Sequence, residues 1–267
     1  MLRVVLRACM LAGLVGVFLA RGRVPRNDLE LRRNTIRTSR YSRLAARVLG
    51  IRLTSEGRRE RRPDGGVLLV ANHLSWIDPM LMAAHRPAVF VTSVETSEDG
   101  FLGRICALSG CVFMERRKRD GLRGECAHLA RLLAGGDVVV FPEATSSNGS
   151  RLLPFRPACF ASALSSGAPV QPAALHYASI DGQPAVGRRR DRVCWYGDMT
   201  FLPHLARLMT IGRIAVEIAF LPPVTADGGC RKTLAVRAHA AIATRLGLYA
   251  PRVRDRRRST ASESVAA

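Results

Sequence analysis

The chain has 267 residues and carries 41 lysines and arginines against 21 aspartates and glutamates, a formal net charge of +20 at pH 7. This length is sufficient for one domain with a full hydrophobic core and additional segments at its ends. Such a basic surface favours polyanionic partners: nucleic acid, anionic lipid headgroups or phosphorylated substrates. Aromatic residues make up only 6% of the chain and no zinc-finger or RNP pattern is present. The composition therefore disfavours nucleic acid and favours anionic membrane lipids.

The chain contains seven scattered cysteines without a C-x-x-C pair: Cys9, Cys106, Cys111, Cys126, Cys159, Cys194 and Cys230. An odd number without metal-ligand spacing is typical of reduced thiols in a cytosol-facing protein, not of a disulfide framework or a zinc site. Cys111 and Cys126 are candidates for reactive thiols, but packing explains them better. We therefore predict no metal site.

Residues 4–20 are apolar except for Arg7. This run is at the short end for a spanning helix, which needs about 20 residues. The arginines that follow it predict that residues 1–22 form a membrane anchor or half-inserted helix at the inner (cytoplasmic) membrane, with the rest of the chain facing the cytoplasm. A cleaved signal peptide is the alternative. We disfavour it because an arginine-rich segment follows.

Residues 23–62 form a second, strongly basic unit. The segment from Arg21 to Arg62 contains fourteen arginines but only four acids. Apolar residues recur there at helical spacing with arginines on the other side: Ile36, Tyr41, Leu44, Ala45, Val48 and Leu49 against Arg37, Arg40, Arg43 and Arg47. The pattern predicts a basic amphipathic helix, ended by Gly50, that lies on anionic lipid. A helix packed on its own domain is the alternative.

Short apolar runs alternate with helical patterns through residues 63–248. Strands are predicted at 67–71, 88–94, 112–114, 137–141, 170–176 and 214–220, and helices at 79–85, 101–109, 121–133, 157–166, 201–209 and 232–246. This alternation predicts an α/β fold with a largely parallel central sheet flanked by helices. The charged tail, residues 249–267, is predicted to be disordered.

The strand at 67–71 delivers Asn72 and His73 at its carboxyl end, where open α/β sheets place their ligands. Asp78 follows five residues after the histidine and precedes Pro79. A histidine with a carboxylate in reach is a general base whose tautomer the carboxylate fixes. The alternatives are a hydrogen-bonded structural histidine, and Asp78 as an N-cap with Pro79 at the first helical position.

Three further blocks follow in order. Gly110–Arg116 reads G-x-x-F-x-x-R, Phe141–Thr145 reads F-P-E-A-T after an apolar run, and Pro169–Pro172 follows another. With N-H-x-x-x-x-D, these blocks resemble those of the glycerolipid acyltransferases, the family of 1-acylglycerol-3-phosphate and other lysophospholipid acyltransferases. The resemblance covers roughly residues 45 to 225.

The resemblance implies roles for individual residues. His73 and Asp78 match the catalytic pair. Arg116 matches the arginine that the family associates with the acceptor's headgroup, and a guanidinium suits a phosphate. Glu143 is expected to bind the acceptor's hydroxyls or to hold the site's arginine. The predicted substrate-binding set is Gly110, Phe113, Arg116, Glu143, Thr145 and Arg156.

The third block departs from the family's usual F-P-E-G-T-R-S. Ala144 replaces a glycine and Ser146 stands where an arginine is usual. The lost charge weakens the match to a lysophosphatidic acid headgroup, and Arg151 or Arg156 is a candidate replacement. The segment Cys194–Asp198 resembles one in some bacterial lysolipid acyltransferases, including those that acylate lyso-ornithine lipid.

Together these features predict a membrane-bound O-acyltransferase that moves a fatty acyl group from an acyl-carrier-protein or coenzyme A thioester to the free hydroxyl of a lysolipid. The acceptor is 1-acylglycerol-3-phosphate or a related lipid such as lyso-ornithine lipid. No cofactor or acyl-enzyme is implied, and the chain has no G-x-S-x-G elbow. A hydrolase that uses the same pair on water is one alternative, and a non-enzymatic basic adaptor for membranes or nucleic acid is another.

Overall fold

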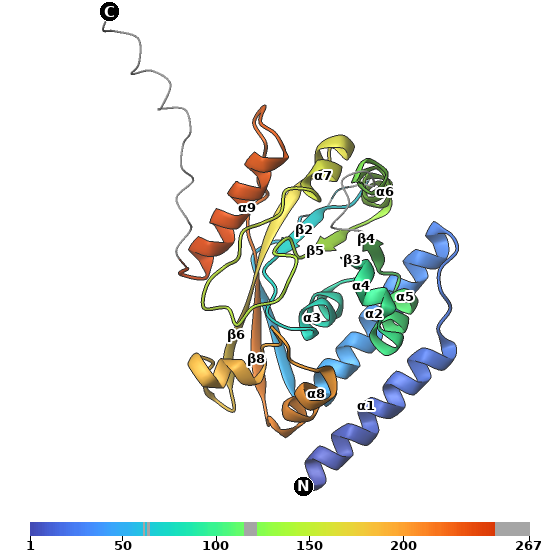
Figure 1. The fold of residues 1–267 in the computed structure, drawn as a ribbon, viewed down its shortest axis with the longest axis vertical. Coiled ribbons are helices and arrows are strands. Elements are labelled where there is room, and N and C mark those ends of the chain that lie inside the picture. Colours follow the sequence, from blue (N-terminus) through green and yellow to red (C-terminus); the bar gives the residue numbers. More distant parts are fainter. Residues whose placement is uncertain (61, 63–64, 115–121, 249–267) are drawn as a thin grey trace, which may run out of the picture.

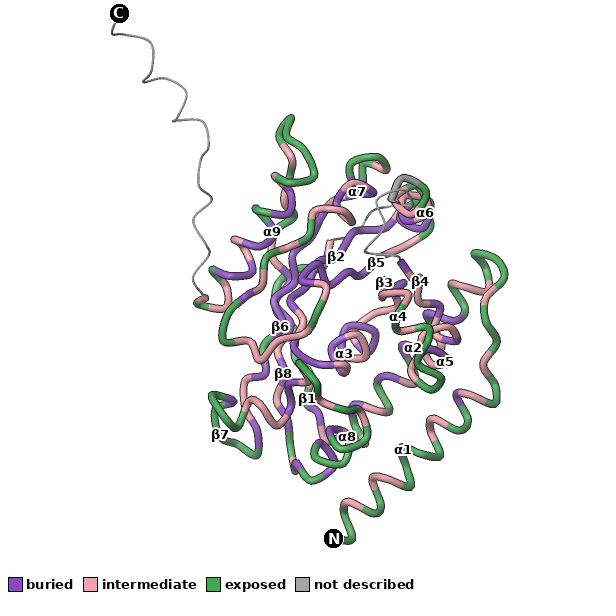
Figure 2. Tube along the Cα trace, viewed as in Figure 1, coloured by how far each residue is buried: buried purple, intermediate pink, exposed green. Residues whose placement is uncertain are grey.

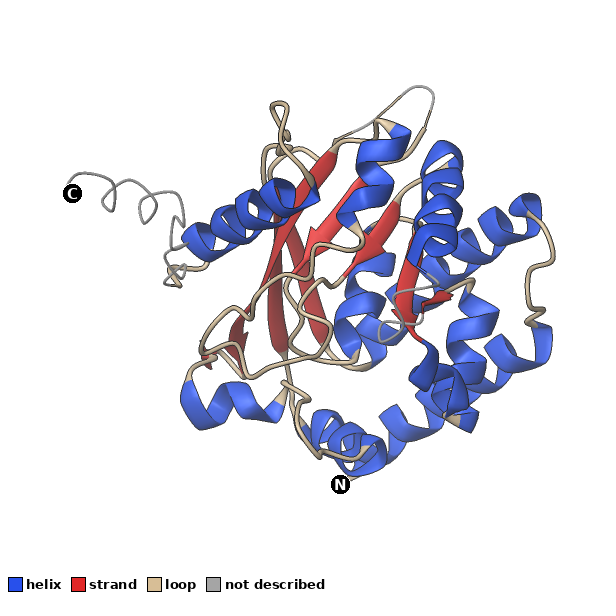
Figure 3. Cartoon of the chain, turned by 45° about the horizontal axis from the view of Figure 1, so that its top comes forward, coloured by secondary structure: helices blue, strands red, loops and turns tan. Residues whose placement is uncertain are grey.

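The computed structural model describes residues 1–60, 62, 65–114 and 122–248. Its centre is a twisted sheet covered by helices on both faces (Figures 1 and 3). The strands are β1 (Ile51–Glu56), β2 (Leu68–Ala71), β3 (Val89–Ser93), β4 (Val112–Met114), β5 (Val138–Val140), β6 (Val170–Ile180), β7 (Gln183–Pro184) and β8 (Ile214–Phe220). The helices are α1 (Leu2–Arg21), α2 (Asp28–Val48), α3 (Ile77–His85), α4 (Val94–Glu98), α5 (Gly100–Ser109), α6 (Leu122–Gly135), α7 (Phe160–Ser166), α8 (Phe201–Thr210) and α9 (Arg231–Arg245), with a 3₁₀ helix η1 (Gly187–Arg192).

The strand order is β1-β8-β6-β2-β5-β3-β4, and β7 pairs with β6 outside this path. The β1–β8, β2–β5, β2–β6, β3–β4 and β3–β5 pairs are parallel. β6 is antiparallel to both β7 and β8. The predicted α/β fold with a largely parallel central sheet is therefore confirmed.

The central strands are apolar on both sides because both faces of the sheet are covered. Leu68 and Val70 pack with side chains of α6, α7 and α9, whereas Leu69 and Ala71 pack with α3 on the opposite face. Buried residues accordingly concentrate along the strands in Figure 2. This two-sided burial holds β2 rigidly and fixes the loop that follows it.

Three differences from the sequence-based boundaries bear on the sheet and the site. The sheet begins before residue 63, because β1 pairs with β8 from Ile51 onward. β6 continues past residue 176 to Ile180, because its pairing with β8 extends that far. α3 begins at Ile77 rather than at Pro79. Asp78 therefore lies inside the first turn of α3 and is not its N-cap.

α1 is long and apolar enough to cross a membrane. It runs along the outside of the molecule near α2 (Figure 1). Arg7, the charge inside the apolar run, donates to the carbonyl oxygens of Met209 (3.3 Å) and Gly212 (2.9 Å), and to that of Ile211. Because the last carbonyls of a helix have no partner within it, these bonds join α1 to the end of α8.

α2 packs on α3, and the residues that α2 buries are small and mostly polar. The buried residues of α2 are Asn34, Thr35, Ser39, Ser42 and Ala46. Ile36 and Leu44 are instead 45% and 44% exposed. The predicted helix is therefore present with part of its apolar side exposed, and its placement on anionic lipid stays a prediction. Arg40 and Arg47 are exposed as well, whereas Leu49 at the end of the helix is buried.

Candidate active site

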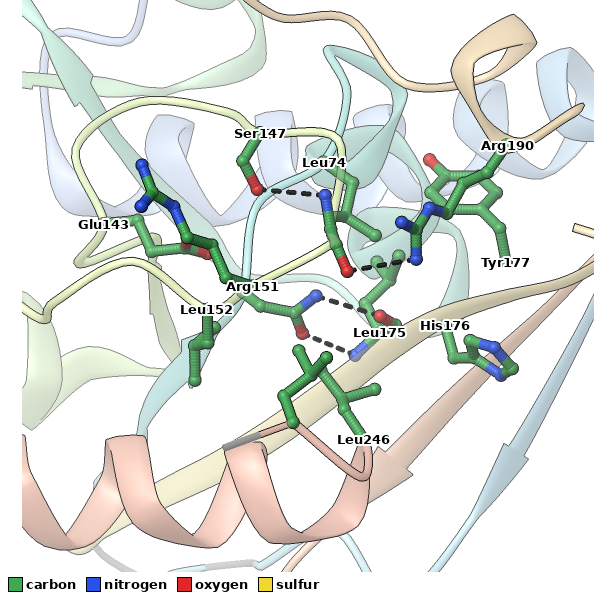
Figure 4. A pocket seen from close by; sticks show the side chains of 13 residues that line it. Leu74, Glu143, Ser147, Arg151, Leu152, Leu175, His176, Tyr177, Arg190 and Leu246 are labelled. Carbon is green, nitrogen blue, oxygen red and sulfur yellow. Dashed lines mark hydrogen bonds between the residues drawn. The ribbon is translucent and has the colours of Figure 1, made fainter. Parts of the chain in front are cut away.

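The site begins where β2 ends and its neighbour β6 continues. Ala71, the last residue of β2, pairs with Ala173. The Asn72 amide then donates to the Leu175 carbonyl (2.9 Å) and accepts from the Leu175 N–H (2.8 Å), as Figure 4 shows for the pair of dashed lines at Leu175. The Asn72 side chain therefore makes the pair of hydrogen bonds to β6 that a further residue of β2 would otherwise make. The backbone can thus leave the sheet at His73.

His73 and Asp78 are joined directly, with 2.9 Å between Nδ1 and Oδ2. Asp78 is fully buried, and its Oδ2 also accepts the backbone N–H groups of Leu74 (2.6 Å) and Ser75 (2.7 Å). The carboxylate thus holds the loop closed. Because the carboxylate accepts, Nδ1 carries the proton and the basic lone pair of the imidazole lies on Nε2.

Tyr177, which sequence reasoning missed, completes the coordination of this carboxylate. Its hydroxyl donates to Asp78 Oδ1 at 2.6 Å, and the residue is 1% exposed. Burial, and after it the charge of Asp78, raises the pKa of Tyr177 well above its usual value. The available signal was a tyrosine next to a buried strand, since a buried phenol normally has a hydrogen-bond partner.

Phe141 and Glu143 support the histidine from the loop after β5. The rings of His73 and Phe141 stack with centroids 4.4 Å apart. Glu143 accepts the backbone N–H of His73 (2.7 Å) on one oxygen and that of Leu153 (2.9 Å) on the other. Burial raises the pKa of Glu143 to about 7, against the opposing effect of these two bonds. In this structure Glu143 clamps two loops together.

The second block is only partly described. Gly110 ends α5 in the left-handed region at φ 80°, and a Cβ there would lie 2.6 Å from a Leu31 side-chain carbon of α2. A larger residue would therefore be strained by the backbone conformation, and its Cβ would require the Leu31 side chain to move. Phe113 is half-buried in β4. Arg116 lies outside the described residues, so its predicted role stays a prediction.

The two candidate replacement arginines line different pockets. Arg156 lines an apolar pocket with Phe141, at the carboxyl ends of β3, β4 and β5. Arg151 lines a second pocket on the α9 side of the loop, whose floor includes Leu74, as Figure 4 shows. His73 lines neither pocket, but its ring stacks on Phe141, which lines the pocket of Arg156. Thr145 is exposed on the same loop.

Within the described ranges, no three histidines, cysteines or acids are grouped so that they could hold a metal ion. The arrangement instead resembles a proton-transfer site. It provides an oriented imidazole, a fully buried carboxylate and an adjacent apolar pocket.

Comparison with known proteins shows the family of the chain. A family model described as Acyltransferase matches residues 52–176, which include His73, Asp78 and Glu143. The lyso-ornithine lipid O-acyltransferase of Brucella abortus is 36% identical over 69% of this chain and 71% of its own length. The chain belongs to this acyltransferase family. The acyltransferase of the same name from Pseudomonas aeruginosa is 32% identical over 93% of this chain and 94% of its own.

A solved structure shows that the fold is shared as well. The 1-acyl-sn-glycerophosphate (LPA) acyltransferase PlsC from Thermotoga maritima aligns with a TM-score of 0.60 at 18% identity. The alignment covers 92% of this chain and 95% of that one. The chain is thus an acyltransferase of the EC 2.3.1 class with the fold that its sequence predicted.

Proposed function

We propose that this acyltransferase is a lyso-ornithine lipid O-acyltransferase, which transfers a fatty acyl group from a thioester to the free hydroxyl of a lyso-ornithine lipid. The observation that carries the proposal is the His73–Asp78 pair beside an apolar pocket, in a chain similar to proteins of that name. Ser146 argues against lysophosphatidic acid as the acceptor, because it occupies the position of the family's usual arginine and brings no positive charge for a phosphate. Its hydroxyl donates to the Trp195 carbonyl.

In the proposed reaction, His73 Nε2 accepts the proton of the lipid hydroxyl while the hydroxyl oxygen attacks the thioester carbonyl. The carbon–sulfur bond then breaks, and the departing thiolate takes the proton back from the imidazolium. The acyl group ends on the lipid oxygen and the carrier leaves as a thiol. Asp78 stabilises the imidazolium through Nδ1. General-base help of this kind is worth roughly 10²–10⁴-fold, so positioning of the two substrates must supply much of the remainder.

The pocket beside Phe141 suits an acyl chain. Val91, Met114 and Val140 contribute to an apolar lining, and among the described residues Glu125 and Arg156 are the charged side chains that line it. An acyl chain in this pocket would place its carbonyl near His73, with Arg156 able to pair with an anionic group of donor or acceptor. Either an acyl-carrier-protein or a coenzyme A thioester would serve as the co-substrate, without a cofactor.

We place the protein at the cytoplasmic surface of the inner membrane, against anionic lipids. Among the described residues, fifteen large hydrophobic side chains are strongly exposed. Twelve of them lie in residues 1–44 or on α5 and α8: Met1, Leu2, Val5, Leu6, Met10, Val17, Val24, Leu29, Ile36, Leu44, Phe101 and Leu202. Arg40 and Arg47 lie on the exposed side of α2 near Ile36 and Leu44. Because Arg3 and Arg7 bond to the end of α8, α1 would lie along the membrane surface with the domain rather than cross alone.

The test is acyl transfer by the full-length protein in membranes, wild type against His73→Ala. The acceptors are lyso-ornithine lipid, lysophosphatidic acid and lysophosphatidylglycerol, each with both thioesters. We expect acylated ornithine lipid in the wild type and its loss in the variant. Preferential acylation of another lysolipid would overturn the acceptor assignment. Thioester loss without an acylated lipid would indicate the hydrolase.

A further inference from the structure

The two oxygens of Asp78 have different environments. Oδ2 accepts from His73 Nδ1 and from the N–H groups of Leu74 and Ser75. Oδ1 accepts from the Tyr177 hydroxyl, at 2.6 Å. In the described part of the chain, Tyr177 and His73 are the side chains that bond to this carboxylate. A bond to a charged acceptor at this length is of the strong, charge-assisted kind.

Strand geometry explains how Tyr177 reaches a carboxylate 99 positions away in the sequence. β2 ends at Ala71, opposite Ala173, whereas β6 continues beside the loop. Tyr177 pairs with Val216 of β8, and the register then shifts before Ser179. Such an irregularity bends the strand and re-aims its side chains. The position of the hydroxyl is therefore fixed by β8 and by the bulge.

From this geometry we infer that Tyr177 is a positioning residue of the acyl transfer. Its hydroxyl holds Asp78 Oδ1, which leaves Oδ2 to face His73, and it draws negative charge away from that oxygen. Tyr177 thereby sets the pH at which His73 becomes able to accept a proton. The inference rests on the proposed role of His73 as the general base.

Tyr177 acts here as a donor that keeps its proton. Burial and the charge of Asp78 raise the pKa of its phenol well above the usual range, so it donates at every working pH. Two other titratable groups lie near Asp78. Burial raises the pKa of Cys194 to about 12, so the thiol stays neutral. Glu143, with a pKa of about 7, titrates in the working range but is common to every variant below.

The experiment compares pH–rate profiles of kcat/KM for wild type, Tyr177→Phe and Tyr196→Phe. Removal of the Tyr177 hydroxyl returns charge to Asp78, which favours the imidazolium. We expect the acid limb to move to higher pH by about half a unit to one unit, and kcat to fall several-fold with little change in KM. Tyr196→Phe is the matched control, since the Tyr196 hydroxyl donates to Asp191 (3.1 Å) and not to Asp78. Its profile should equal that of the wild type.

A second variant covers the case in which Tyr177→Phe does not fold. Tyr177→fluorotyrosine keeps the hydroxyl and nearly the same shape but makes it a stronger donor. Its acid limb should move to lower pH, opposite to Tyr177→Phe. Unchanged profiles in the folded variants would reduce Tyr177 to a packing role. A wild type without His73-dependent transfer to any lysolipid would instead contradict the proposed function, which separates the two failures.

Discussion

Two histidines near one tryptophan have contrasting surroundings in this protein. His204 of α8 is 2% exposed and uses both ring nitrogens internally. Its Nδ1 accepts the Trp76 indole N–H (3.0 Å), and its Nε2 donates to the Cys194 carbonyl (3.0 Å). A histidine with both nitrogens satisfied in this way can neither accept nor release a proton without losing a bond.

His73 differs in three respects. One nitrogen bonds to the buried carboxylate of Asp78, and the other has no partner among the residues described. Its side chain is 19% exposed. Trp76, three residues along the same loop, therefore links a histidine prepared for chemistry to one that holds the loop in place. The comparison predicts that variants at the two positions separate activity from stability.

The largest effect is expected for His73→Gln. Loss of the general base should reduce acyl transfer by roughly 10²–10⁴-fold, whereas the melting temperature in detergent should stay near that of the wild type. The measurement is product formation in parallel with thermal unfolding. If transfer continued at the wild-type rate, His73 would join His204 as a structural residue.

Asp78→Asn should reduce both acyl-transfer activity and stability. Turnover should fall on the order of 10²-fold, because the amide no longer fixes the imidazole tautomer or stabilises its charge. The amide NH₂ would also face one of the donors that now bond to the carboxylate, which costs roughly 1–3 kcal/mol. Turnover and denaturant unfolding of the same preparation test this. A folded variant with full activity would contradict the orienting role.

His204→Phe is the reverse case. It leaves the Trp76 N–H and the Cys194 carbonyl without their partner, which should lower the free energy of unfolding by roughly 1–3 kcal/mol. Activity per folded molecule should change by less than about 3-fold, because the stacking and hydrogen bonds of His73 do not involve His204. A loss comparable to that of His73→Gln would show that the two histidines act together.

The smallest expected effect is on the pH dependence of the melting temperature. Burial lowers the pKa of His204, so the folded state favours the neutral ring. The neutral His204 ring contributes fully to stability at pH values above the pKa of histidine in the unfolded chain, about 6.5. This contribution is lost as the pH falls from there toward the lower pKa of His204 in the folded protein. The wild-type melting temperature should therefore fall more steeply below pH 6.5 than that of His204→Phe.

The sequence predicted the parts of the site that are local in the chain. His73 and Asp78 lie five residues apart in one loop, so their spacing alone indicated a pair. Tyr177 and the Asn72–Leu175 bonds could not be predicted, because they depend on how far β6 extends beyond β2. That extension is set by pairing with β8, which no local pattern reveals.

Helix α2 shows a second limit of local patterns. Its apolar spacing predicted the helix, but the residues that it buries are small and mostly polar: Asn34, Thr35, Ser39, Ser42 and Ala46. The spacing of apolar residues does not reveal burial of this kind, because small polar side chains carry no apolar signal. Local patterns also did not reveal that the two oxygens of Glu143 bond to the backbone N–H groups of His73 and Leu153. Its expected role toward the acceptor's hydroxyls or the site's arginine stays a prediction.

The bonds of Arg7 have a consequence for synthesis of the protein. The carbonyls that it contacts lie 202, 204 and 205 residues further along the chain. At about 5–20 residues per second, α1 leaves the ribosome roughly 10–40 s before these partners exist. During that interval the apolar helix has the bilayer available and its own domain not yet formed. The nascent chain is therefore expected to reach the membrane first and to complete its catalytic fold there.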